Sequence, residues 1–228
     1  HQRHLPAERP FKVDWAGHAD LVEGPDGQYY GVFLAIRPNE ENRVNTGRET
    51  FILPVDWSGT FPVFKGGLEP IQPKLVMPQG VKNETGKNGY FPNGNFTFTE
   101  TFTGSSLDYR WVGVRGAREG FISTTAEGLT ITPYETNIKA ALPTSTLFYR
   151  QQHLNFTATT TLKYVPRTEK DLAGITCYQS EKFNYVFGVT KKAEDSYIVL
   201  QRTEKGESST IASEKIEGNT PISLRVTA

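Results

Sequence analysis

The sequence predicts an all-β protein, and three observations support this prediction. The 228 residues are only 36% hydrophobic, yet 12% are aromatic, and Tyr, Phe, Thr and Gly are frequent. Such a composition favours strands and turns over helices. Short runs in which apolar and polar residues alternate recur along the chain, with turn residues between them. No stretch shows a convincing helical period of 3.6 residues.

Residues 1–64 contain three expected strands. The first two, in GHADLVE and QYYGVFLAIRP, flank Gly-Pro-Asp-Gly at 24–27, and an Asp-Gly pair between apolar runs predicts a hairpin. The second strand is almost continuously apolar, so we expect it to be buried on both faces. In the third, TFILPVDW, Pro54 indicates an edge position or a bulge. Three such strands can form one propeller blade or one layer of a sandwich.

Residues 65–96 are interrupted by Gly and Pro at short intervals and show no periodicity. Tyr90, Phe91 and Phe96 nevertheless supply apolar anchors. We therefore expect an extended connector that lies over a surface.

Residues 97–228 carry many short alternating runs, spaced as in a β-sandwich. The expected strands lie in FTFTETF, GFISTTAEGLTITPY, TLFYRQQH, LNFTATTTLKYV, AGITCYQ, FNYVFGVT, SYIVLQRT, STIASEKI and ISLRVT. No repeat of fixed length is visible.

The composition also excludes several functional classes. Lys and Arg number 25, as do Asp and Glu, so no basic surplus exists to bind a phosphate backbone, and we expect no nucleic-acid partner. Cys177 is the single cysteine, which forbids a disulfide within the chain and a zinc site built from cysteines. No apolar run approaches the ~20 residues that a membrane helix needs, so we expect no membrane partner.

Both ends of the sequence suggest a piece of a longer protein. It begins HQRHLPAERP, with neither an initiator Met nor a signal peptide, and it ends PISLRVTA, in which Ile222, Leu224 and Val226 alternate with polar residues as in a strand. We expect the function of the parent protein to differ from that of this chain alone.

Three residues of the first region could bind a ligand. His18 stands beside Gly17 before an apolar strand, where the backbone can approach a ligand closely; a hydrogen-bonded core histidine is the alternative. The Arg48 guanidinium could donate two hydrogen bonds to a carboxylate or to vicinal hydroxyls; a structural ion pair with Glu49 is the alternative. Arg37 ends the buried strand, and it either points into a pocket or caps that strand.

Carboxylates also occur in or near these strands. Paired carboxylates would suit the hydrolysis of a glycosidic bond. Each has a plain alternative, however: Asp26 is a turn residue, and Glu23 and Asp56 lie at strand ends. The pattern therefore assigns none of them a catalytic role.

Two runs, GHADLVEGPDGQYYGVFLAIRP and NTGRETFILPVDWSGTFPVF, resemble the last part of the catalytic domain of glycoside hydrolase family 43. The likeness is greatest to its β-xylosidase and α-L-arabinofuranosidase members, and Phe61-Pro62 is a mild departure from the Trp-Pro or similar pair of the family. Three further runs, FTETFTGSSLDYRWVGVRG, LFYRQQHLNFTATTTLKYVP and DLAGITCYQSEKFNYVFGV, resemble the β-sandwich that follows that domain. Together the resemblance covers almost the entire chain.

The resemblance implies an all-β chain that forms the last part of a five-bladed β-propeller followed by an incomplete antiparallel β-sandwich. Residues 1–64 would then form the C-terminal blade region, residues 65–96 the connector, and residues 97–228 a truncated accessory domain.

The resemblance further implies an inverting exo-glycosidase that releases terminal xylose or arabinose from xylo- or arabino-oligosaccharides. In the family an Asp base, a Glu acid and a second Asp carry out the reaction. Their motifs do not occur in this sequence, so we expect the catalytic residues upstream of His1 and assign no acid or base role to Asp20, Glu23 or Glu49. A secreted or periplasmic location is the corresponding expectation.

Three residues carry over from the family as candidate substrate-binding residues. His18 matches a central propeller histidine, which in some members faces a bound calcium or its water, so His18 is also a candidate metal residue. Arg48 matches the arginine of GRET, which reaches sugar hydroxyls. Arg37 carries over only as a strand-end residue at the same rim. No cofactor is required, and a calcium ion at the propeller centre is the one metal that the resemblance suggests.

A non-catalytic carbohydrate-binding module, or a purely structural sandwich, is the alternative function. Tyr178, Phe183, Tyr185 and Phe187 could form an aromatic platform for a sugar. Because they alternate with residues such as Asn184, we expect them to pack in the core instead, in a sandwich that buttresses the propeller.

Overall fold

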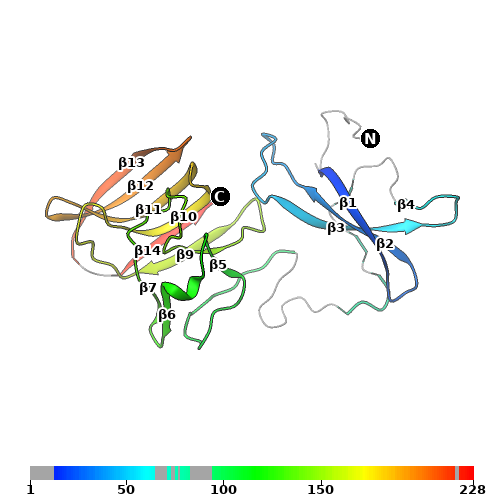
Figure 1. Ribbon diagram of the computed structural model, residues 1–228, viewed down its shortest axis with the longest axis horizontal. Helices are drawn as coiled ribbons and strands as arrows, with labels where there is room; N and C mark the ends of the chain where they lie inside the picture. Colours follow the sequence, from blue (N-terminus) through cyan, green and yellow to red (C-terminus); the bar gives the residue numbers. More distant parts are fainter. Residues whose placement is uncertain (1–12, 65–70, 73–74, 77, 83–93, 219–220) are drawn as a thin grey trace. The chain divides into compact units, whose positions relative to one another are not determined.

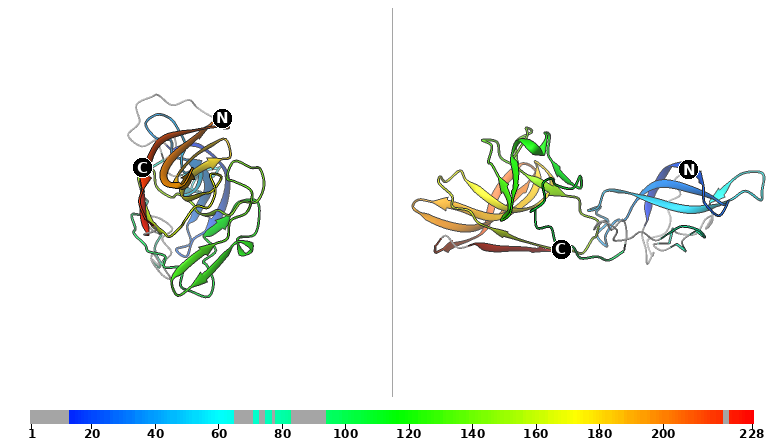
Figure 2. Two further views of the ribbon diagram at one scale, coloured as in Figure 1. Left: turned by 90° about the vertical axis from the view of Figure 1, so that its left-hand side faces the viewer. Right: turned by 90° about the horizontal axis from the view of Figure 1, so that it is seen from below.

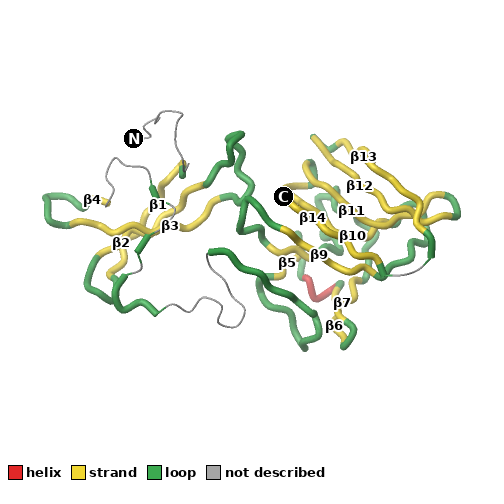
Figure 3. The backbone as a smooth tube through the Cα atoms, turned by 180° about the vertical axis from the view of Figure 1, so that it is seen from behind, coloured by secondary structure: helices red, strands yellow, loops and turns green. Residues whose placement is uncertain are grey.

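The protein is described from a computed structural model, which defines residues 13–64, 71–72, 75–76, 78–82, 94–218 and 221–228. The chain folds as two compact units. The first comprises residues 1–99 with 151–154, and the second comprises residues 100–150 with 155–228. Strands make up nearly all the regular structure of both units (Figures 1 and 3), so the all-β prediction is confirmed. Most of the connector expected at 65–96 lies outside the described residues.

The first unit contains the strands β1 (Asp14–Glu23), β2 (Tyr29–Ile36), β3 (Arg48–Asp56) and β4 (Val63–Phe64). The second unit contains β5 (Trp111–Gly113), β6 (Ile122–Thr125), β7 (Gly128–Ile131), β8 (Leu147–Tyr149), β9 (Thr157–Leu162), β10 (Leu172–Ser180), β11 (Phe183–Lys192), β12 (Asp195–Glu204), β13 (Glu207–Ile216), β14 (Ile222–Thr227) and the 3-10 helix η2 (Arg118–Gly120). No helix among the described residues is long and apolar enough to cross a membrane.

The four strands of the first unit form an antiparallel sheet in the order β1-β2-β3-β4, the arrangement of a single meander. The predicted hairpin joins β1 to β2. Gly27 takes a φ of 73°, and its backbone N–H donates to the carbonyl of Gly24 at 3.0 Å. The Asp26 carboxylate accepts a hydrogen bond from the Tyr30 hydroxyl at 2.8 Å, and this bond holds the pKa of Asp26 below its usual value. Turn chemistry therefore fixes this connection locally.

The core of the first unit lies on one face of this sheet. Phe33 and Ala35 are buried there, and the Phe33 ring packs against Phe51 with centroids 6.0 Å apart and edge-on against Phe64 at 6.1 Å. The Phe64 ring lies over Gly31, which has no Cβ to obstruct it. The strand β2 is buried or half-buried except at Tyr29, largely as its apolar run predicts.

The edge position predicted for Pro54 is also confirmed. Along most of its length β3 pairs only with β2, because β4 reaches just Val55 and Asp56. Proline has no N–H to donate, so it is tolerated where one side of a strand has no partner.

The second unit is built on a four-stranded antiparallel meander in the order β10-β11-β12-β13, which is accompanied by three strand pairs, β14-β9, β5-β8 and β6-β7. Figure 2 shows β14 alongside β9, and Ile222 lies opposite Leu162 in their register. Val189, Val199 and Leu224 are the largest fully buried side chains. The strands expected from residue 120 onward are all present.

One expected strand is wrong. FTFTETF, residues 96–102, forms no strand although its residues alternate. Phe102 takes a φ of 57°, its backbone N–H bonds to the Glu100 carboxylate at 2.9 Å, and its ring packs on Trp111 at 5.0 Å. Alternation yields a strand only where a neighbour pairs the backbone, and this segment uses local bonds instead.

Two adjacent strands approach each other closely at a pair of glycines. Gly174 of β10 lies opposite Gly188 of β11. A Cβ on Gly188 would lie 2.8 Å from the carbonyl carbon of Ala173, and a Cβ on Gly174 would collide with the Phe187 carbonyl. This pair of strands can therefore take the observed spacing only with glycine at both positions.

Candidate functional site

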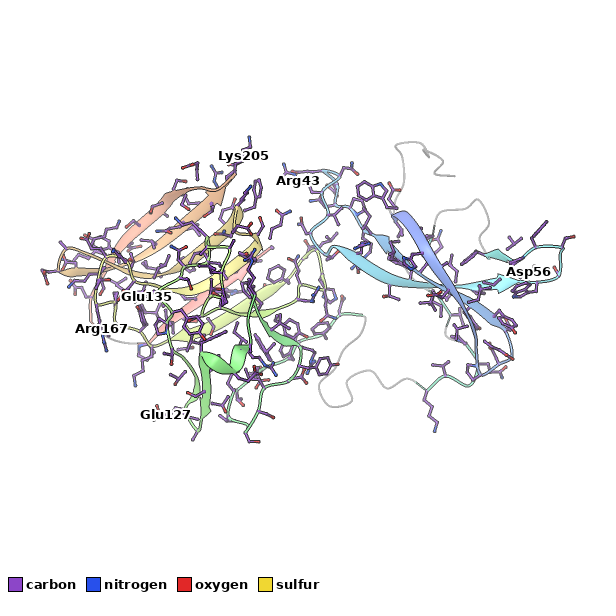
Figure 4. The ribbon with its side chains drawn as sticks, in the orientation of Figure 1. Arg43, Asp56, Glu127, Glu135, Arg167 and Lys205 are labelled. Atoms are coloured by element: carbon purple, nitrogen blue, oxygen red, sulfur yellow. The ribbon has the colours of Figure 1, made fainter. Side chains whose placement is uncertain are left out.

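The candidate site lies at the end of the first sheet where β1 begins, β2 ends and β3 begins. In the register of the three strands, Asp14, Ile36 and Arg48 lie side by side. Arg37 follows directly after β2, and a loop over residues 37–47, which includes Arg43 (Figure 4), returns the chain to β3. The sheet therefore brings Arg37 and Arg48 to the same end of its strands, in line with the shared rim that the family resemblance implies.

Arg48 projects from the start of β3. Gly47 immediately precedes Arg48, and its φ of 73° allows the chain to turn into β3 at this point. The Arg48 residue is exposed, and within the described part of the chain no hydrogen bond or ion pair engages its guanidinium. A guanidinium in this state can donate to a bound carboxylate or to two hydroxyls.

Glu49 is bound by Arg37, not by its neighbour Arg48. Arg37 Nε donates to Glu49 Oε1 at 2.9 Å and Arg37 Nη2 donates to Glu49 Oε2 at 2.7 Å. The Thr46 hydroxyl also donates to Glu49 Oε1 at 2.9 Å, and Arg37 Nη2 contacts the carbonyl oxygen of Gln152 at 3.3 Å. The bond to Glu49 raises the pKa of the Arg37 guanidinium above its usual value.

Strand geometry explains this choice of partner. Successive residues of a strand point to opposite faces, so Arg48 and Glu49 point away from each other. Ala35 lies opposite Glu49, and Arg37, two residues further on, is its diagonal neighbour on the same face. The structural alternative for Arg48, an ion pair with Glu49, is therefore wrong. Arg37 itself is occupied by structural partners.

His18 lies in a distorted part of β1. The register shifts twice, between Asp14 and Gly17 and between Gly17 and Asp20, and His18 lies within the second of these irregular stretches. His18 has a φ of 54° and Trp15 a φ of 52°, values that are uncommon for residues other than glycine. Every residue of β1 is exposed in this chain, so His18 is not part of the core of the first unit. Bulges and left-handed residues of this kind concentrate at functional sites.

A calcium site at His18 does not fit the residues that the structure describes. Calcium takes six to eight oxygen ligands, whereas His18 offers a ring nitrogen. Among the described residues no three His, Cys, Asp or Glu side chains come together to hold an ion. We therefore derive no chemical step through a metal.

Two of the four aromatic residues considered as a sugar platform depart from the core position expected for them. Phe183 is 40% exposed and Tyr185 45% exposed, while Asn184 between them is buried. The Asn184 amide donates to the carbonyl of Ser180 at 3.1 Å, so its burial costs no hydrogen bond. Tyr178 and Phe187 are half-buried, and the Tyr178 ring packs on Phe148 with ring centroids 5.2 Å apart.

Sequence reasoning missed the network around Glu49. The residue pattern does not indicate a role for Thr46 or Gln152, and for Glu49 it indicates only a carboxylate near the strands or a partner of Arg48. The signal that places Arg37 and Glu49 on one face is the register of β2 against β3, in which Ala35 lies opposite Glu49, and the sequence alone does not reveal that register.

The fold and the site together define a class of protein. It is an all-β chain in which a four-stranded meander, with an exposed arginine at one end of a strand, is followed by an antiparallel sandwich unit. A family model described as the beta xylosidase C-terminal concanavalin A-like domain matches residues 99–228. The chain belongs to this domain family, and with it to glycoside hydrolase family 43.

Several known proteins are similar to the chain. A non-reducing end alpha-L-arabinofuranosidase of Bacteroides ovatus is 27% identical over 97% of this chain and 40% of its own length. A xylosidase/arabinosidase of Butyrivibrio fibrisolvens is 29% identical over 92% of this chain and 40% of its own length. The crystal structure of a GH43_12 protein from a capybara gut metagenome is 50% identical, with a TM-score of 0.86 over 99% of this chain and 42% of that one. The chain thus spans about 40% of the length of the relatives it matches.

Proposed function

We propose that the chain is part of an inverting exo-glycosidase that removes terminal xylose or arabinose from hemicellulose oligosaccharides. The observation that carries this proposal is the exposed Arg48, whose guanidinium has no partner among the described residues while the adjacent Glu49 is fully engaged by Arg37 and Thr46. The names of the relatives, an arabinofuranosidase and a xylosidase/arabinosidase, support the substrate class.

In this proposal Arg48 binds sugar hydroxyls beside the catalytic centre. During inverting hydrolysis one carboxylic acid protonates the leaving oxygen, and a carboxylate activates water on the opposite face of the sugar. A guanidinium near that carboxylate favours its ionised form, because an opposite charge lowers the pKa of a carboxyl group. Glu49 is a poor candidate for either role, since Arg37 and Thr46 occupy its oxygens.

The proposal is tested with the full-length protein that contains this chain. We expect it to release the aryl group from an aryl β-xyloside or an aryl α-arabinofuranoside and to leave an aryl β-glucoside intact. The chain of 228 residues expressed alone should turn over neither pentoside. A full-length protein without pentosidase activity, or a chain that is active by itself, would contradict the proposal.

A second candidate function, carbohydrate binding by the sandwich, is favoured by the exposure of Phe183 and Tyr185. Tyr185 lies opposite Arg202 in the register, and Arg202 forms an exposed ion pair with Glu204 at 3.3 Å. Arg202 and Glu204 also line an open surface hollow of about 400 Å³ near Lys205, which marks the turn after β12 (Figure 4). Aromatic rings beside such polar groups can stack on a sugar ring while its hydroxyls are bound.

Affinity electrophoresis on xylan and arabinan tests this second function. We expect the polysaccharide to retard the protein, and the variant Phe183→Ala/Tyr185→Ala to lose that retardation. Tyr109→Ala is the control, because Tyr109 is a 75% exposed tyrosine elsewhere in the same unit. Equal migration with and without polysaccharide, or equal retardation of all variants, would favour a purely structural sandwich.

A further inference from the structure

Glu49, the partner of Arg37, is the sequence neighbour of the residue to which we assign substrate binding. Glu49 follows Arg48 directly, and the Thr46 hydroxyl, which precedes Arg48 by two residues, donates to the same carboxylate. The side chains of Thr46 and Glu49 thereby close a short loop around Gly47 and Arg48. The backbone that carries the Arg48 side chain is fixed on both sides.

The network is more rigid than a surface ion pair. Arg37 donates through Nε and Nη2 to both Glu49 oxygens, and such two-pronged bonds fix orientation as well as distance. The side chains of Arg37 and Glu49 are 34% and 25% exposed. In the loop over residues 37–47, the side chains of Arg43 and Glu41 also form an ion pair, but they are 75% and 66% exposed. Such an exposed pair constrains the chain much less.

A third element holds Arg37 from another direction. The segment 151–154 belongs to the first unit although the second unit precedes and follows it in sequence. The Gln152 carbonyl accepts a hydrogen bond from Arg37. His153 Nε2 lies 2.8 Å from the Gly94 carbonyl oxygen, and the His153 ring packs edge-on against Phe96. We call residues 151–154 the strap. The Arg37 guanidinium therefore lies between Glu49 and this strap, which the contacts of His153 hold in place.

We propose that Glu49, held by Arg37 and by the strap at 151–154, is a positioning residue that fixes Arg48 for substrate binding. This inference rests on the proposed function. Glu49 contacts no substrate in this arrangement, because it points to the face opposite Arg48. It acts by limiting the directions in which the Arg48 side chain can leave the strand.

A double-mutant cycle in the full-length enzyme tests this role. Glu49→Gln keeps the size of the side chain and removes the charge that binds Arg37. We expect it to lower kcat/KM by roughly five- to fifty-fold, with the same division between kcat and KM as Arg48→Ala. In the Arg48→Ala background, Glu49→Gln should change kcat/KM less than about two-fold. Glu41→Gln, which opens the exposed pair of the same loop, should leave the kinetics unchanged.

The outcomes separate the two proposals. If Glu49→Gln lowers kcat/KM by the same factor with and without Arg48, the two residues act independently and the positioning role is overturned. If Arg48→Ala itself has no effect, both the substrate-binding role and the positioning role fail. Should Glu49→Gln not fold, Thr46→Ala removes one bond to the same carboxylate. Its smaller loss, roughly two- to five-fold, should likewise vanish in the Arg48→Ala background.

Discussion

Replacing Arg48 with alanine in the full-length enzyme should lower kcat/KM by roughly ten- to a thousand-fold and leave the melting temperature nearly unchanged. A hydrogen bond from a charged donor contributes about 1.5–3 kcal/mol, and loss of one or two such bonds in the transition state accounts for this range. Folding should be unaffected because the exposed Arg48 has no partner among the described residues to leave unpaired.

The variant Arg48→Lys sharpens this prediction. Lysine keeps the charge but cannot donate two parallel bonds to vicinal hydroxyls, so we expect it to recover little of the lost activity. Steady-state kinetics and thermal melts of both variants are the measurements. A variant that melts earlier and keeps its turnover would mean that Arg48 serves the fold.

The second large effect concerns stability. Gly174→Ala or Gly188→Ala should destabilise the second unit by more than about 3 kcal/mol, which corresponds to a fall of roughly 10 °C in melting temperature. A Cβ at either position meets backbone atoms of the paired strand, which cannot move aside as a flexible side chain would. Relief of the overlap therefore requires β10 and β11 to separate.

A matched control is available in the same unit. At Gly104 an added Cβ would meet only the Ser106 carbonyl oxygen at 3.5 Å, an ordinary contact. Gly104→Ala should therefore melt within a few degrees of the unmodified protein. Thermal unfolding followed by circular dichroism compares the variants, and equal melting of all of them would show that β10 and β11 can separate at little cost.

Local patterns were sufficient to predict most of the fold. The hairpin at 24–27 follows from an Asp-Gly turn, the edge position from Pro54, and the strands from residue 120 onward from alternation between turns; the short β5 was not predicted. Each of these signals depends on residues close together in sequence. FTFTETF shows the limit of the method, because a strand also needs a partner that the pattern cannot reveal.

The partners of the candidate site could not be predicted in this way. Which carboxylate Arg37 meets depends on the register of β2 against β3, and the loop over residues 37–47 is too long to set that register by turn type. Gln152 is still more remote, since it contributes a backbone carbonyl from more than a hundred positions away.

Alternation in β11 distinguished two faces but not which of them is buried. The apolar side chains of Phe183 and Tyr185 favoured their own face as the core. The buried face instead carries Asn184, because the carbonyls of Ser180 and Glu181 at the preceding turn accept its amide. A satisfied polar group can therefore be buried next to exposed aromatic residues, and only the turn geometry decides this.

The strap at 151–154 determines how this protein can be divided or recombined. The chain passes from the first unit to the second after residue 99, returns for four residues, and leaves again after residue 154. No single cut separates the two units: one at 99 deprives the first of the carbonyl that binds Arg37, and one at 154 leaves β5 to β8 on the wrong side. Exchange of this sandwich for that of another protein would therefore require three junctions, after residues 99, 150 and 154, or a donor that supplies its own strap.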